Sequence, residues 1–202
     1  MDFDPVRAKA EGRELEGMDA ATAALFPSEF EQSELGPIPI GWNAGHLGGV
    51  CEIARSVAQK ASILADDKYV GLEHIPRESW ALAEWGTAEG LQSGKSRFVV
   101  GDILFGKLRP YFHKVCIAPV DGVCSTDILV LRPVALWMPF VLCHVSSKTL
   151  IEYATRLSNG AKMPRTKWQD LYSYPIAVPS ERLAEKFADV IRPIVLKGRS
   201  SS

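Results

Sequence analysis

The sequence has no long hydrophobic run, no export signal and no metal-ligand pattern. No stretch of about 18 apolar residues occurs, and the amino terminus is acidic where a leader would be basic and then apolar, so neither a membrane span nor secretion is predicted. The four cysteines, Cys51, Cys116, Cys124 and Cys143, show no Cys-x-x-Cys or Cys/His spacing. Because apolar residues flank each of them, we predict reduced core thiols in a cytoplasmic protein without a bound metal.

Catalytic signatures are also missing. The chain has no P-loop and no Gly-x-Ser-x-Gly elbow. It has neither the Gly-rich loop after a strand nor the Asn-Pro-Pro-aromatic motif that an adenine methyltransferase would need. The nearest match to the carboxylate cluster of a nuclease, Asp66-Asp67-Lys68, is typical of a turn. We therefore predict a protein that is not an enzyme and needs no cofactor.

Charge is distributed unevenly along the chain, although its net charge is only -1. Residues 1–40 carry nine acidic and three basic side chains, a net of -6, whereas residues 41–202 carry fifteen acidic and twenty basic ones, a net of +5. Residues 95–114 contain five basic side chains and one acid, and residues 156–167 contain four and none. Gly, Pro and aromatic residues predict that both segments are loops, and their charge predicts contact with a polyanion. The alternative is a solvated surface whose charge is balanced elsewhere.

Three short apolar runs dominate the centre of the sequence, and each is bounded by Gly, Pro or Asp. Their β-branched residues predict buried strands of one sheet at residues 99–105, 115–118 and 128–131. The connection between the first two runs carries Lys107, Arg109, Tyr111 and Lys114. Cationic and aromatic side chains on a loop held by rigid strands are typical of a functional site.

The remaining pattern predicts an α+β fold in which a mixed sheet of short strands is covered by a helix. A short helix is expected at 20–26, and strands are expected within 42–54, 69–75 and 174–180. Apolar spacing predicts one helix over 140–157, ended by Asn159-Gly160. A last amphipathic helix starts at Glu181, and we expect it to be kinked by Pro193 and to project away from the sheet.

GDILFGKLRPYFHK at 101–114, followed by GVCSTDILVLRP at 122–133, resembles the target recognition domain of a type I restriction-modification specificity (S) subunit. Further agreement comes from outlying segments: DFDPVRAKAEG, LFPSEF, SELGPIPIGW, NGAKMPRTKW and YPIAVPS. The resemblance covers nearly the whole chain. It implies an acidic arm or linker at 1–40, a DNA recognition domain at 41–180, and the truncated start of a conserved spacer helix at 181–202.

That resemblance implies a subunit without an active site of its own. It would recognise a sequence in double-stranded DNA, and a modification (methyltransferase) subunit and a restriction subunit would then methylate adenine or cut. A single recognition domain would read a two-part site by forming a homodimer, and its target would then be an inverted repeat.

Eleven residues are candidates for DNA contact. Six are expected mostly at phosphates, where Lys and Arg supply salt-sensitive affinity: Lys95, Arg97, Lys107, Lys114, Lys162 and Lys167. Three are expected at base edges: Arg109, Tyr111 and Arg165. Ser125 and Thr126 could add hydroxyl contacts, or they could cap the turn before a strand.

Two other classes of function stay open. In the first, the basic loops of an interaction module or inactive fragment dock on an acidic protein, and no base preference exists. In the second, an unrecognised active site exists, and a single carboxylate or histidine substitution abolishes turnover.

Overall fold

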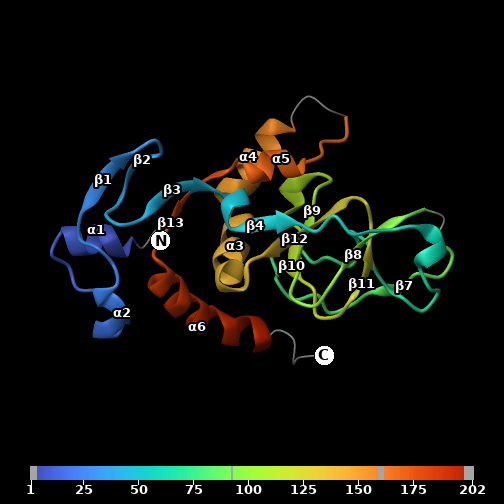
Figure 1. The fold of residues 1–202 in the computed structure, drawn as a ribbon, viewed down its shortest axis with the longest axis horizontal. Helices are drawn as coiled ribbons and strands as arrows, with labels where there is room; N and C mark the ends of the chain where they lie inside the picture. Colours follow the sequence, from blue (N-terminus) through green and yellow to red (C-terminus); the bar gives the residue numbers. More distant parts are fainter. Residues whose placement is uncertain (1–3, 92, 159–161, 198–202) are drawn as a thin grey trace.

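The computed structural model describes residues 4–91, 93–158 and 162–197. Its amino-terminal segment lies at one end of an elongated molecule, and two sheets lie toward the other end, with helices along both sides (Figure 1). Residues 1–40, expected as an arm or linker, contain secondary structure: α1 (Pro5–Ala10), α2 (Ala20–Ala24) and a hairpin of β1 (Phe30–Ser33) and β2 (Gly36–Pro39). The short helix predicted near residue 20 is confirmed. Its first turn is capped by Asp19, whose carboxylate accepts the Thr22 N–H at 2.9 Å.

The three central apolar runs contribute to one sheet, as predicted. The sheet has four antiparallel strands in the order β10-β9-β12-β4: β10 (Val115–Ile117), β9 (Ile103–Gly106), β12 (Ile128–Pro133) and β4 (Cys51–Ile53). Side chains alternate across β9, so that Ile103 and Phe105 join one hydrophobic cluster and Leu104 joins another. Burial on both faces explains why this stretch is continuously apolar rather than alternating.

A second sheet covers the other face, so the prediction of a single sheet is wrong. Its five strands follow the order β5-β8-β11-β6-β7: β5 (Val57–Ala58), β8 (Lys95–Phe98), β11 (Gly122–Cys124), β6 (Lys68–Val70) and β7 (Gly86–Thr87). The β11–β6 pair is parallel and the other pairs are antiparallel, which makes the sheet mixed. Val70 and Phe98 from this sheet pack with Leu104 and Val130 from the first.

The run predicted as one strand at 99–105 is a turn followed by β9. Val99 and Val100 are 44% and 49% exposed, and Gly101 has a φ of +91°. The Asp102 carboxylate accepts the Val99 N–H at 2.9 Å and so closes the turn. The chain thereby passes from the second sheet to the first, a change of direction that the apolar composition concealed.

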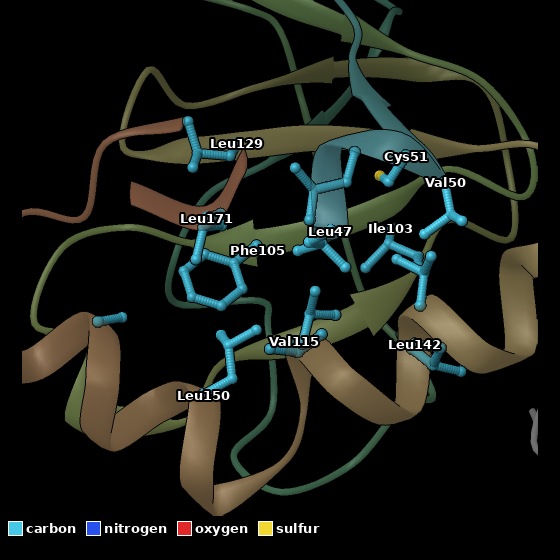
Figure 2. Close-up of a cluster of buried hydrophobic side chains, with 14 of the residues drawn as sticks. Leu47, Val50, Cys51, Ile103, Phe105, Val115, Leu129, Leu142, Leu150 and Leu171 are labelled. Carbon is cyan, nitrogen blue, oxygen red and sulfur yellow. The ribbon is translucent and has the colours of Figure 1, made fainter. Parts of the chain in front are cut away.

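Two helices replace the single helix predicted over 140–157. They are α3 (Met138–Val145) and α4 (Lys148–Leu157). The chain breaks at Ser146-Ser147, where the Ser147 hydroxyl accepts the Leu150 N–H at 3.2 Å and starts the second helix. The predicted stop, Asn159-Gly160, lies outside the described residues. Both helices cover the first sheet, and Figure 2 shows Leu150 beside Phe105 and Val115, with Leu142 farther along the same core on the side of Ile103.

Ser147→Ala should lower the free energy of unfolding by about 1 kcal/mol, because the first turn of α4 loses its cap. Urea denaturation followed by circular dichroism measures this change. Ser28→Ala, in an exposed loop, is the control and should shift stability by less than about 0.5 kcal/mol. Equal stability of both variants would mean that α4 does not depend on this cap.

The last segments return to the start of the folded body. Helix α5 (Trp168–Tyr172) comes first and is followed by β13 (Pro175–Val178). Strand β13 pairs antiparallel with β3 (Asn43–His46), which is followed by the 3₁₀ turn Leu47–Gly49. Helix α6 (Glu181–Lys197) contains Pro193 and packs along α3 through buried Leu183, Ala184 and Ala188. Its first half therefore lies against the body (Figure 1), whereas we had expected it to project away.

Candidate nucleic-acid interface

The two predicted basic loops meet at one end of the first sheet, although about fifty residues separate them in sequence. Residues 107–114 follow β9, and residues 162–167 precede α5. Backbone hydrogen bonds join them: Arg109 N donates to Pro164 O at 2.8 Å and Thr166 N donates to Lys107 O at 2.9 Å, around a bridge between Leu108 and Arg165. With residues 125–127, which precede β12, they form a single surface that we call the recognition surface.

Asp127 holds this surface together, although no sequence pattern singles it out. Its carbonyl oxygen accepts the Lys107 N–H at 2.9 Å, and its carboxylate accepts Nε of Arg165 at 3.0 Å. The ion pair uses only the Nε side of the guanidinium, and the terminal nitrogens have no hydrogen-bond partner among the described residues. Arg165 is thus oriented by the protein while its forked end stays available, and its side chain is 48% exposed.

The outer rim of the recognition surface is cationic and aromatic. Its exposed side chains are Arg109, Tyr111, Lys162, Arg165 and Lys167, and Lys107 is half-buried. Arg109 has a φ of +52°, a conformation that non-glycine residues rarely adopt. Backbone strain of this kind persists only where the surroundings impose it, and it often accompanies function.

Neighbouring elements hold the Pro110–Phe112 turn, called η3, in a fixed position. The Arg77 guanidinium lies 4.4 Å from the centre of the Phe112 ring, which in turn meets the Tyr111 ring edge to face at 4.9 Å. His113 Nε2 lies within hydrogen-bond distance of the Ser146 carbonyl oxygen, at 2.5 Å, and this contact ties the turn to the corner between α3 and α4. The exposed Tyr111 ring therefore projects from a rigid base.

Three predicted contact residues have charged groups that are already engaged inside the protein. Lys95 and Arg97 lie in β8 of the second sheet, not in a loop as predicted. Lys95 is only 9% exposed and donates to Ser93, whereas Arg97 donates to the Ser62 carbonyl at 2.5 Å and lies 3.9 Å from an Asp67 oxygen. Lys114 donates to the Leu72 carbonyl. These three residues are separate from the exposed rim, because their cationic groups stabilise loops instead.

The two predicted hydroxyl residues differ in their surroundings. Ser125 accepts the Asp127 N–H at 3.2 Å, which is the turn-capping alternative, and its side chain is half-buried. Thr126 is exposed at the tip of the same turn. Thr126 alone of the two presents its side chain fully on the recognition surface.

The described residues contain no group of three or more His, Cys, Asp or Glu side chains placed to hold a metal ion. The cysteines are free, and burial raises the thiol pKa of Cys51, Cys116 and Cys124 to about 12 and that of Cys143 to about 11, so all four stay protonated near neutral pH. No described helix has the length and apolar content needed to cross a membrane.

Comparison with known proteins gives one relative and two solved structures of interest. The chain is 28% identical to the type I restriction enzyme EcoDI specificity subunit of Escherichia coli, over 77% of this chain and 36% of that protein. No protein-family model matches. The fold resembles the HsdS subunit from Thermoanaerobacter tengcongensis, with a TM-score of 0.63 at 20% identity over 80% of this chain and 44% of that one.

A second solved chain, from a study of complex assembly and conformational transition of the type I R-M system, gives a TM-score of 0.65 at 22% identity. It covers 80% of this chain and 43% of that one, so the chain spans between a third and a half of the proteins it matches. The chain is thus similar in sequence to a type I restriction enzyme specificity subunit, and its α+β fold is like that of part of an HsdS subunit.

Proposed function

We propose that this chain recognises a specific sequence of double-stranded DNA as a specificity component of a type I restriction-modification system. One observation carries the proposal: backbone hydrogen bonds join the two basic loops, so that they form one exposed surface at the end of a rigid sheet. Sites built in this way keep their side chains in fixed relative positions, which base reading requires.

Within this proposal the exposed residues divide the work by their chemistry. Lys107, Lys162 and Lys167 contact phosphates and set the position of the duplex. Arg109 and Arg165 reach base edges, where the guanidinium fork matches O6 and N7 of guanine in the major groove. Tyr111 and Thr126 contact neighbouring bases or sugar. Lys95, Arg97, Lys114 and Ser125 are left out of the interface, because their polar groups bond within the protein.

The same proposal assigns chemistry to partners. A modification subunit would methylate adenine at the sequence chosen by this chain, and a restriction subunit joined through it would cut the DNA. A homodimer would place two recognition surfaces about a two-fold axis and read an inverted repeat. This chain itself would take no catalytic step.

Selection of bound duplexes from a randomised DNA pool tests the proposal. The purified chain should enrich a defined sequence at low salt, with or without a cognate modification subunit. An inverted repeat with a constant gap would indicate a dimer, and a single short site would indicate one recognition surface acting alone. Failure to enrich any sequence, even with the modification subunit present, would exclude DNA recognition by this chain.

Lys167→Ala should weaken binding of all duplexes to a similar extent and reduce the slope of log affinity against log salt concentration by about 1, because one phosphate contact is lost. Fluorescence anisotropy at several salt concentrations measures this slope. Lys186→Ala, on the exposed side of α6, is the matched control and should leave the slope unchanged. A slope that changes equally in both variants would reflect net charge and not a contact made by Lys167.

A further inference from the structure

A groove of about 640 Å³ runs beside the recognition surface, between η3 and α4. Its lining includes Tyr111 and His113 at η3, Ile151, Thr155 and Arg156 of α4, and Glu78. Tyr111 belongs both to this groove and to the recognition surface, so the two are continuous. Arg156 is exposed and adds a cation to this groove.

Backbone strain is concentrated at this groove. Glu78, Arg109 and His113 are the non-glycine residues of the described chain that have positive φ, with values of 53°, 52° and 53°. They lie together, since Arg109 and His113 flank η3 and Glu78 N donates to His113 O at 3.1 Å. Strained conformations of this kind persist where the surrounding structure imposes them, and they cluster at functional sites.

The Glu78 carboxylate is chemically out of place in a cationic neighbourhood. It is exposed and forms no ion pair with any described residue, whereas the other acid of the groove, Glu152, lies 3.8 Å from the Lys148 ammonium. The preceding residue, Arg77, fixes the position of the Glu78 backbone. Arg77 forms a backbone β-bridge with Lys114, and its guanidinium lies over the Phe112 ring. An exposed carboxylate beside cations that are proposed to bind phosphates would weaken DNA binding unless it accepted a hydrogen bond from the DNA.

We infer that Glu78 is a base-reading residue of a second subsite, which accepts a hydrogen bond from the exocyclic amino group of a cytosine at the flank of the sequence read by Arg109 and Arg165. Carboxylates accept hydrogen bonds from cytosine N4 in the major groove, and they repel the acceptor-rich edge of guanine. Arg156 contacts a phosphate of the same strand, and Tyr111 separates the two subsites. This inference rests on the proposed function.

Glu78→Gln tests the inference, because glutamine keeps the shape of the side chain and removes its charge. Duplex selection should show that the preference at one flanking base pair falls about tenfold. Affinity averaged over all sequences should stay equal or rise, because a repulsive charge is lost. A variant that was merely damaged would bind all sequences more weakly. Glu89→Gln, an exposed carboxylate next to β7, is the control and should leave the preference unaltered.

A second variant separates base reading from backbone strain. Glu78→Gly relieves the positive φ, so its unfolding midpoint should equal or exceed that of the wild type while the flanking preference is lost as in Glu78→Gln. An unchanged preference at every position in both variants would overturn the inference while leaving the proposed function intact. Loss of binding to a modification subunit with an unaltered DNA profile would also overturn it and would identify the groove as a protein-docking site. The absence of any selected sequence for the wild type would instead contradict the proposed function itself.

Discussion

Replacing Arg132 with alanine should lower the free energy of unfolding by about 3 kcal/mol, because a buried carboxylate would lose its cation. Asp102 is 2% exposed at the start of β9, and two parallel hydrogen bonds of 2.8 and 2.7 Å join it to Arg132 on β12. The same bonds raise the pKa of the Arg132 guanidinium. We expect the lower end of the range for broken buried pairs, since the Arg132 side chain is itself 47% exposed.

Urea denaturation of a double variant shows whether the unpaired charge is the cause. Asp102→Asn combined with Arg132→Ala removes both charges, and the asparagine oxygen can still accept the Val99 N–H that closes the turn. The double variant should therefore be more stable than Arg132→Ala alone. If it is less stable, the loss comes from packing of the arginine stem and not from an unpaired carboxylate. The base preference of both variants should equal that of the wild type.

Replacing Arg165 with alanine should affect base preference and not stability. Discrimination at one base pair should fall by about 1–3 kcal/mol, whereas the free energy of unfolding should change by less than about 1 kcal/mol. Its ion pair with Asp127 resembles that of Arg132 in chemistry but lies at the surface, where the carboxylate is 26% exposed and water can replace the lost partner. Arg109→Ala should relax a different base pair, since Arg109 lies across the joined loops from Arg165.

Competition binding with single-base variants of the selected duplex measures this discrimination. Arg97→Ala is the matched control. Arg97 also forms an ion pair with an aspartate, but it lies in β8 of the second sheet and not on the recognition surface. It should leave base preference unchanged. If Arg109→Ala and Arg165→Ala both behave like this control, the base-reading assignment is wrong, although the relationship to specificity subunits would remain.

The sequence predicted the strands of the first sheet, but it missed four of the five strands of the second sheet, β5, β7, β8 and β11, and it did not show how the chain changes direction. Runs with a clear apolar pattern, such as those that form β9, β10 and β12, were located correctly because burial requires such residues. The turn at Val99–Asp102 and the break at Ser146-Ser147 were missed. Both depend on a side chain that bonds to the backbone nearby, Asp102 in one case and Ser147 in the other, and such bonds leave no trace in hydropathy.

The candidate interface was partly foreseeable for a similar reason. Clustered charge indicated which two segments matter, but it could not show that Lys95, Arg97 and Lys114 use their charges to hold loops in place. Nor could it show that Asp127 joins the segments, since a lone acid between a turn and a strand is common. Only the tertiary structure separates cations that face the solvent from cations that stabilise the protein.

The pairing of β3 with β13 has an evolutionary consequence. The chain leaves through His46 and returns through Pro175, and these two residues are register partners in adjacent antiparallel strands. Everything between them, including the whole recognition surface, is thus joined covalently to the rest of the chain through one two-stranded stem, and α3 also packs against α6. Under the proposed function, recombination between related genes at these two points would exchange the whole recognition surface at once and leave the amino-terminal segment and α6 in place, provided that α3 still packs against α6. A new DNA target would then come from a single exchange.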